Sequence, residues 1–142
     1  MALVIREAEV RDIPCLLEMN DEFNGPGATI ASMKDALENK MGEIVMVAVL
    51  HDVVVGFVCG QLHKSICYAD GLSAELTELF VRKEHRRKGI AAKLVTALEA
   101  EFLKNDAHEI IVKTGDVNEE AKGLYFSCGY EDYKETVFFK EI

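Results

Sequence analysis

The order of strand-like and helix-like segments limits the folds open to this chain more than any other feature of its sequence. Polar and apolar residues alternate over 3–6, which predicts a strand, and the apolar spacing after Asp12, an expected N-cap, predicts a helix. The turn residues at 24–27 (Asn-Gly-Pro-Gly) end that helix. A second, weaker helix then ends near Gly42.

The rest of the chain is richer in strands. Two β-branched runs, 43–50 and 53–62, are separated only by His51-Asp52 and predict a hairpin. The remaining expected elements are a strand over 74–81, an amphipathic helix from Gly89, a strand over 108–113, a helix over 118–128 and a final strand over 130–140. Helices and strands do not alternate regularly in this order, so a doubly wound parallel sheet fits poorly. We expect an α/β fold of the mixed α+β type, with helices flanking a mixed sheet.

Length and composition favour a single domain over residues 1–142. The chain is close to the roughly 150 residues typical of one domain, and 49% of its residues are hydrophobic. No internal repeat or shift in composition marks a domain boundary. Neither a signal peptide nor an apolar run of membrane-spanning length is present, so we expect a soluble, cytoplasmic protein.

The four cysteines do not predict a cross-linked framework. Cys15, Cys59, Cys67 and Cys128 form no C-x-x-C pair, and no histidines lie at zinc-site spacing. We therefore expect reduced thiols and no metal site, with Cys59 in the core because it lies within an apolar strand.

One short basic segment stands out from an acidic chain. The formal net charge is −9, yet residues 82–88 hold five Lys or Arg and one Glu, a local charge of +4 that leaves −13 for the rest. Gly89 follows at an expected strand-to-helix turn, where backbone N–H groups and the helix dipole attract anions. The segment predicts a phosphate or pyrophosphate site, with a solvated loop as the alternative, and no P-loop or dinucleotide motif is present. The acidic remainder disfavours nucleic acid and anionic membranes as partners.

Two ordered motifs lie in the second half of the chain. Arg86-Arg87-Lys88-Gly89-Ile90-Ala91 follows the strand 76–81 and matches the signature Q/R-x-x-G-x-G/A. A second motif, N-x-x-A-x-x-L-Y-x-x-x-G-F/Y, is matched at full spacing by Asn118, Ala121, Leu124, Tyr125, Gly129 and Tyr130. With these motifs the chain resembles the GNAT family of N-acetyltransferases.

The resemblance, which covers about 72–132 strongly, implies a fold and a cofactor. The fold is GNAT-like, with a central mixed, mostly antiparallel sheet flanked by about four helices, and the cofactor is acetyl-CoA. The backbone amides from Arg87 to Ala92 would hold its pyrophosphate, and the strand 76–81 would pair with its pantetheine arm. The cofactor-binding residues that the resemblance implies are Leu79, Phe80, Val81, Arg86, Arg87, Lys88, Gly89, Ile90, Ala91, Ala92, Asn118 and Tyr125.

Tyr125 is the first candidate for a catalytic residue. Asn118 and Tyr125 are seven residues apart, so a regular helix would put both on one face. In the family such an asparagine contacts the cofactor and such a tyrosine protonates the departing CoA thiolate. A tyrosine packed into the core with its hydroxyl satisfied is the alternative, which periodicity alone favours.

Transfer to an amine also needs a group that takes a proton, because a primary amine with a pKa near ~10.4 is mostly charged at pH 7. Glu75 and Glu78 have an odd separation, which puts them on opposite faces of a regular strand. The resemblance favours Glu78 for contact with the acceptor, directly or through water, and Glu75 second; a solvent-facing charge is the alternative for each. Asp21, Glu22 and Asn24 precede the Gly-Pro-Gly loop, where the family commonly builds its acceptor pocket, so they join Glu78 as expected substrate-binding residues.

These residues predict an acetyl-CoA-dependent N-acetyltransferase that transfers the acetyl group by direct attack, without a metal or a covalent enzyme intermediate. The acidic chain favours a small polycationic amine; residues 84–91 look like those of the aminoglycoside 3-N-acetyltransferases, and polyamine acetyltransferases share the acidic strand position. Acetylation of a protein N-terminus or lysine, and a CoA-binding module without catalysis, are the alternatives. We expect His63 and His85 to be surface groups. A homodimer is among the oligomeric states that the sequence allows.

Overall fold

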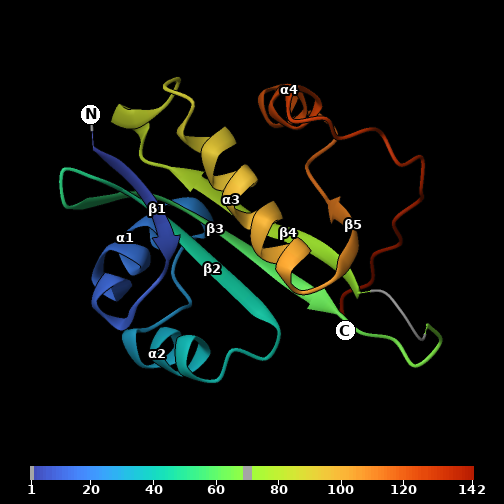
Figure 1. Cartoon of the computed structure of the whole chain (residues 1–142), viewed down its shortest axis with the longest axis horizontal. Helices are drawn as coiled ribbons and strands as arrows, with labels where there is room; N and C mark the ends of the chain where they lie inside the picture. The colour runs from blue at the N-terminus through green and yellow to red at the C-terminus, as the bar shows by residue number, and fades with distance from the viewer. Residues whose placement is uncertain (1, 69–71) are drawn as a thin grey trace.

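The computed structural model describes residues 2–68 and 72–142 of the chain (Figure 1). Its elements are, in chain order, β1 (Leu3–Glu7), η1 (Val10–Asp12), α1 (Ile13–Asn24), α2 (Ile30–Glu38), β2 (Glu43–Leu50), β3 (Val53–His63), β4 (Leu72–Val81), η2 (Lys83–His85), α3 (Ile90–Lys104), β5 (Ala107–Val112) and α4 (Glu119–Ser127). Within the described residues, no helix combines the length and the hydropathy that crossing a bilayer requires.

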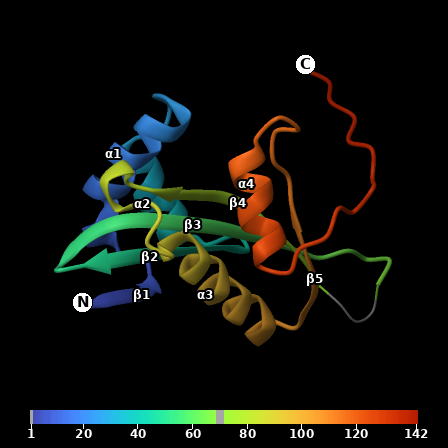
Figure 2. The same ribbon diagram turned by 90° about the horizontal axis from the view of Figure 1, so that it is seen from above.

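The five strands form one sheet in the order β1-β2-β3-β4-β5. The first four are antiparallel neighbours, and β5 runs parallel to β4. Helices α1 and α2 cover one face and α3 covers the other, as Figure 2 shows. The expected fold class, a mixed sheet flanked by four helices, is confirmed. The expected hairpin is confirmed too, with His51 and Asp52 at φ of 50° and 64°, as a two-residue type I′ turn requires.

Apolar clusters on the two faces of the sheet hold the layers together. On one face α3 completely buries Leu94, Leu98 and Phe102. Gly60 of β3 lies directly beneath this helix: a Cβ there would be 2.3 Å from the Phe102 ring, so only glycine allows so close an approach. On the other face α1 packs against a smaller cluster that Cys59 borders, in keeping with its expected place in the core.

Strand β4 has a neighbour on both sides for only part of its length. Its parallel pairing with β5 ends at Leu76 opposite Val112, whereas its antiparallel pairing with β3 continues to Val81. The two strands therefore diverge, and from Thr77 onward β4 has no strand partner on its β5 side in the described chain.

The expectation of a final strand over 130–140 is wrong. No strand follows α4 in the described residues, and every residue from 131 to 142 is exposed. The segment has the composition of a strand, but a strand gains its hydrogen bonds only from a neighbouring strand. Residues 131–142 have no such neighbour in the structure.

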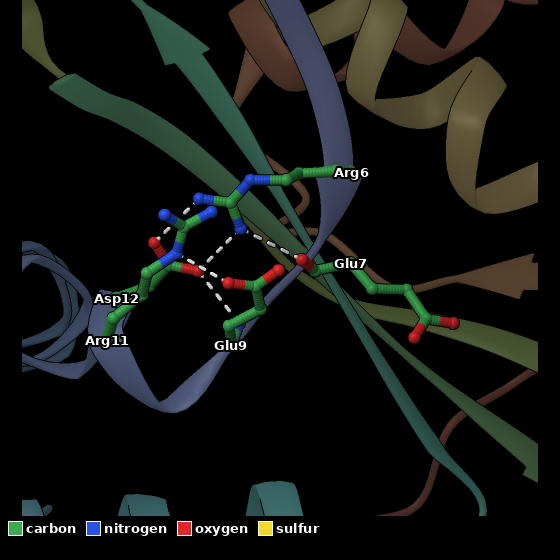
Figure 3. A network of polar contacts seen from close by, with 5 residues as sticks. All are labelled: Arg6, Glu7, Glu9, Arg11 and Asp12. Atoms are coloured by element: carbon green, nitrogen blue, oxygen red, sulfur yellow. Dashed lines mark hydrogen bonds and ion pairs between the residues drawn. The ribbon is translucent and has the colours of Figure 1, made fainter. Parts of the chain in front are cut away.

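Asp12 ties β1 to the beginning of α1 (Figure 3). The Arg6 guanidinium donates hydrogen bonds to both of its carboxylate oxygens, at 2.7 and 2.9 Å, and the Glu9 backbone N–H donates a third at 2.7 Å. Asp12 does occupy the N-cap position of α1, but its side chain makes no cap bond to that helix. Burial acts to raise the pKa of Asp12, and the hydrogen bonds from Arg6 and Glu9 outweigh burial, so the pKa lies below its ordinary value.

We expect Asp12→Asn to lower the free energy of unfolding by about 1–3 kcal/mol at pH 7, because Arg6 loses its buried charged partner. The pKa of Asp12 is lower in the folded than in the unfolded chain, so its stabilisation is present above the ordinary carboxyl pKa and is lost as the pH falls through the lowered value. Urea unfolding should show that the difference in the free energy of unfolding between variant and wild type becomes smaller as the pH falls. Glu7→Gln, which removes an exposed ion pair with Lys40, is the control and should cost less than about 1 kcal/mol. A difference that stays constant into acid would contradict this role for Asp12.

Candidate functional site

A cleft of about 580 Å³ opens where β4 and β5 diverge. Its walls come from β4, the loop that follows it, the first turn of α3, the end of β5 and α4. The lining residues are Phe23, Leu76, Thr77, Leu79, Phe80, Val81, His85, Arg86, Arg87, Gly89, Ile90, Ala91, Ala92, Val112, Lys113, Thr114, Asn118, Glu120, Ala121, Leu124 and Tyr125. This volume lies in the range of small-molecule and cofactor sites.

The free half of β4 forms one wall of the cleft. From Thr77 to Val81 its outward N–H and C=O groups have no strand partner in the described chain. Arg86 closes the end of this edge, because its Nε donates a hydrogen bond of 2.8 Å to the Val81 oxygen. An open strand edge of this kind binds extended ligands whose own amide groups complete the ladder.

The turn before α3 has the backbone shape of an anion site. Arg87 and Gly89 both adopt left-handed conformations, with φ of 61° and 78°. The helix then begins, and the first hydrogen bond to the turn is the one that the Lys93 N–H donates to the Gly89 oxygen. The N–H groups of residues 90–92 thus precede the helical ladder and point out of its positive end, next to a turn that directs further N–H groups the same way.

The basic residues of this loop divide into structural and free cations. Arg82 is held by Glu18 at 2.7 Å and by the Val54 oxygen at 3.1 Å. The Arg86 guanidinium lies over the Phe80 ring, 5.3 Å from its centre. Arg87 is exposed, lines the cleft and makes no ion pair among the described residues, so its charge is free for an anionic ligand. Lys88, expected to contact the cofactor, is exposed but does not line the cleft.

Tyr125 lies deep in the opposite wall. Its side chain is buried and packs edge-on against Tyr130, with ring centres 5.7 Å apart. The Tyr130 hydroxyl donates to Glu99 of α3 at 2.9 Å, whereas the Tyr125 hydroxyl makes no hydrogen bond to the described residues. Burial, with a smaller contribution from Cys128, raises the pKa of Tyr125 to about 12, so it keeps its proton at neutral pH. Asn118 also lines the cleft, but as the N-cap of α4, where its side chain accepts from the Ala121 N–H at 3.1 Å.

A bulge in β4 changes the expected orientation of the two glutamates. Cys59 of β3 pairs with Glu78, but the next residue of β3 pairs with Leu76, so Thr77 is an extra residue in β4. Leu76 and Leu79 consequently both pack against the α3 side of the sheet. Glu75 and Glu78 therefore share the face that carries α1, and the expectation of opposite faces is wrong.

The two glutamates have different neighbours on that face. Glu78 accepts a hydrogen bond of 3.3 Å from Asn24 at the end of α1. Glu75 lies 3.1 Å from His63 Nε2 and 3.7 Å from Lys113 Nζ. Glu78 is flanked in sequence by two residues that line the cleft, Thr77 and Leu79. Glu75 lies instead in the half of β4 that pairs with β5.

Glu43 of β2 completes this acidic face and was not anticipated. Burial raises its pKa, and the charge of Glu78 raises it further, so the two carboxylates lie within electrostatic reach. The register of three strands explains its position, because Glu43 pairs with Gln61 of β3, and Gln61 pairs with Glu75 of β4. This register would have been needed to find Glu43 from the sequence. Asp21 and Glu22, by contrast, are exposed on α1, and their side chains make no hydrogen bonds with the described residues.

The structure thus brings most of the expected cofactor residues into one cleft, Lys88 excepted. The lining residues that were not among the expected cofactor-binding residues are Phe23, Leu76, Thr77, His85, Val112, Lys113, Thr114, Glu120, Ala121 and Leu124. Leu76 and Thr77 do lie in the strand 76–81 that was expected to pair with the pantetheine arm. Ala121 and Leu124 belong to the second motif, so their spacing was already a signal. His85, expected at the surface, is only partly exposed, and its Nδ1 is buried without a hydrogen-bond partner in the described chain.

Comparison with known proteins identifies the family. The model of the acetyltransferase (GNAT) family matches residues 13–130, most of the chain. The chain belongs to the GNAT family. Human N-acetyltransferase 8 is 33% identical over 101 residues, which are 70% of this chain and 44% of that protein, so the chain spans less than half the length of this relative.

Solved structures of GNAT-type enzymes share the fold. An aminoglycoside acetyltransferase, meta-AAC0020 from an uncultured soil metagenomic sample, in complex with sisomicin, superposes with a TM-score of 0.84 at 21% identity, over 99% of this chain and 95% of that one. AAC(6')-Iy in complex with a bisubstrate analog, CoA-S-monomethyl-acetylneamine, gives 0.86 at 16% identity, over 100% and 99%. At these identities the likeness establishes the fold.

We expect Arg87→Glu to weaken coenzyme A binding by at least about tenfold, because a charged hydrogen bond contributes roughly 1.5–3 kcal/mol and the variant adds repulsion. Gly89→Val should weaken it as well, since a β-branched residue resists the left-handed backbone of the turn. Lys93→Glu reverses the same charge on the exposed side of α3, outside the cleft, and serves as the control. Calorimetry with coenzyme A measures all three, and circular dichroism checks the fold. Unchanged affinity in both cleft variants would show that the anion site lies elsewhere.

Proposed function

We propose that this protein transfers the acetyl group of acetyl-CoA to a primary amine of a small, cationic acceptor. The observation that carries the proposal is one cleft in which an open strand edge leads into an anion-binding turn. Acetyl-CoA needs both features, because its pantetheine arm holds amide groups and its other end holds a pyrophosphate. Membership of the GNAT family supports the same cofactor.

Each part of the cleft has a separate role in holding the cofactor. The N–H groups of residues 87–92 and the Arg87 side chain bind the pyrophosphate. The edge of β4 from Thr77 to Val81 binds the pantetheine arm as an added strand. Apolar side chains of α4, Ala121 and Leu124, cover the arm from the other wall and exclude water. The thioester then lies between β4 and Tyr125.

Tyr125 supplies the proton for the leaving group. The amine nitrogen forms a bond to the thioester carbon, the carbon–sulfur bond breaks, and the electron pair goes to sulfur. Tyr125 donates its hydroxyl proton to that sulfur, which its raised pKa permits because the hydroxyl is still protonated at neutral pH. The open hydrogen-bonding capacity of the hydroxyl supports this role, since a tyrosine retained only for packing would have its hydroxyl satisfied.

Glu78 receives the proton that the acceptor amine releases, directly or through water, with Glu75 as the second candidate. Its position between two cleft residues and its contact with Asn24 support this choice. Glu43 and Glu78 together make the floor beside the cleft negative, which favours an ammonium group there. The acceptor would enter between this floor and the end of α1.

The relatives bear on the acceptor class. Two neighbours of the same fold are aminoglycoside acetyltransferases, one solved with sisomicin and the other with the bisubstrate analog CoA-S-monomethyl-acetylneamine. This chain shares with them the fold, and its acidic face provides an independent reason for a polycationic acceptor. Acetylation of a protein N-terminus or lysine is the competing proposal.

We also propose that residues 1–142 work as a single domain in the cytoplasm. One continuous sheet from β1 to β5 supports the single domain. Cys15, Cys59, Cys67 and Cys128 are all free thiols, which fits a compartment that keeps cysteines reduced.

Thiol release from acetyl-CoA, measured with aminoglycosides, polyamines, amino acids and N-terminal peptides at low and high salt, tests the proposal. We expect turnover with the polycationic amines and a rate at low acceptor concentration that falls as salt screens the acidic face. Preference for a neutral or peptide acceptor, or a rate that does not change with salt concentration, would contradict the proposed class of acceptor. Binding of acetyl-CoA without turnover on any amine would leave only a cofactor-binding module.

Tyr125→Phe should lower kcat by about 10², the usual scale for one general acid, with the KM for acetyl-CoA little changed. The ring and its packing against Tyr130 remain, so only the proton is removed. Tyr133→Phe, which deletes the hydroxyl of an exposed tyrosine outside the cleft, is the matched control and should leave kcat unchanged. Wild-type turnover in Tyr125→Phe would reduce this residue to a core packing role.

A further inference from the structure

Lys113 places a primary amine in the cleft. It is the only lysine among the described residues that line the cleft, and it follows directly after the last residue of β5. Ile110 and Val112 pack against the cluster beneath α3. Because side chains alternate along a strand, Lys113 lies on the other face, the one that carries α1 and the two glutamates of β4.

Lys113 also lies at one particular end of the free edge of β4. The pairing of β4 with β5 ends at Leu76 and Val112, and Lys113 is the next residue of the chain. It is therefore level with Thr77, where the free edge begins. The turn before α3 lies past the other end of this edge, after Val81. A cofactor with its pyrophosphate in that turn and its pantetheine arm along the edge has its thioester at the Thr77 end, beside Lys113.

A carboxylate is close enough to take a proton from this amine. The Lys113 Nζ is 3.7 Å from Oε2 of Glu75, and the other oxygen of Glu75 contacts His63 Nε2 at 3.1 Å. A primary amine attacks a thioester only after it loses its extra proton. The Lys113 side chain is 61% exposed and flexible, so a small rotation or one bridging water brings the two groups within hydrogen-bonding distance.

Tyr125 borders the same space from the opposite side. It belongs to the cluster beneath α3, on the face of the sheet that Lys113 does not share. The two side chains thus flank the opening between β4 and β5, and both line the cleft. A thioester in this opening has an amine on one side and a proton donor on the other.

We infer that the protein acetylates its own Lys113 when acetyl-CoA is bound without an external amine. The inference rests on the proposed function, because it uses the same thioester and the same proton donor. The amine needs no binding step, since β5 already holds it at the thioester end of the cleft.

The protons and electrons of this transfer balance within the cleft. The ammonium of Lys113 gives one proton to Glu75, and the free amine forms a bond to the thioester carbon. The carbon–sulfur bond breaks, its electron pair goes to sulfur, and Tyr125 donates a proton there. The second proton of the nitrogen restores the Tyr125 hydroxyl through water, and Glu75 releases its proton to solvent. The products are acetylated Lys113 and free coenzyme A.

Acetylation would change the charge beside the acceptor site. An acetylated lysine is neutral, so the ion pair between Lys113 and Glu75 would end. Glu75 would then add its negative charge to that of Glu43 and Glu78 on the same face. A cationic acceptor would meet a more negative surface, so the modification would adjust the acceptor affinity of the same cleft.

Mass spectrometry of the full chain, incubated at neutral pH with saturating acetyl-CoA and no added amine, tests the inference. We expect one acetyl group per chain, which peptide mapping places on Lys113. An amine held beside the thioester reacts faster than a free one, so labelling of Lys113 should be at least about tenfold faster than that of the exposed Lys134 and Lys140. The rate per molecule should not change when the protein is diluted, since each chain labels itself.

Variants connect the labelling with the cleft. Tyr125→Phe and Glu75→Gln should each slow labelling of Lys113 by at least about tenfold, because each removes one proton transfer. Tyr133→Phe, at an exposed tyrosine outside the cleft, is the matched control and should be labelled at the wild-type rate. Lys113→Arg keeps the positive charge and should lose the acetyl group found on the wild type. Circular dichroism checks that each variant folds.

Thiol release with an added polycationic amine measures the proposed function separately. Release without labelling of Lys113, or labelling no faster than at Lys134, would overturn the inference and leave the proposed function standing. A rate per molecule that rises with protein concentration, or one that either cleft variant leaves unchanged, would also overturn it, because the acetyl transfer would then occur between molecules or without catalysis. Labelling without release to any amine would support the inference and contradict the proposed acceptor class, and the absence of both would overturn both.

Discussion

Strand β4 can pair on its β5 side only as far as Leu76, and the cleft exists because of that limit. A sheet satisfies backbone groups by pairing them, so a strand that keeps one neighbour and loses the other leaves a row of donors and acceptors facing outward. Here that row is flanked by the first turn of α3 on one side and by α4 on the other. The same divergence thus creates the open edge, the space beside it and the route to the turn before α3.

The bulge at Thr77 decides which side chains meet at that edge. Without the extra residue, Glu75 and Glu78 would lie on opposite faces, and one of them would have to be buried beneath α3. With it, both carboxylates lie on the face that carries α1, and Glu43 joins them from β2. One added residue in a strand therefore keeps the side chains beneath α3 apolar and gathers the carboxylates on the face that carries α1.

The residues expected at the site from the sequence line the cleft where they lie close together in the chain. The anion turn, residues 86–92, and the α4 residues Asn118 and Tyr125 are local features, since glycine placement, charge and helical spacing are all readable along the chain. Phe23 was missed because it reaches the cleft through the packing of α1 against Phe80 of β4. Glu43 and the end of β5 were missed because only strand register and strand order bring them to this region. The bulge was missed for the same reason, since it is defined by the pairing partner and not by the residues of β4 alone.

The segment that follows α4, residues 131–142, also shows the difference between local and long-range signals. Its residues have the local preference of a strand, and that part of the sequence signal is sound; the structure lacks the neighbour that would turn preference into a strand. A helix completes its hydrogen bonds within its own segment, as α4 does up to its final turn, but a strand is a property of two segments. The expectation of a strand over 130–140 is therefore wrong because the described chain provides no strand that pairs with this segment. The residues after α4 and the outer edge of β5 are both suited to strand pairing, and the described chain leaves the two unpaired.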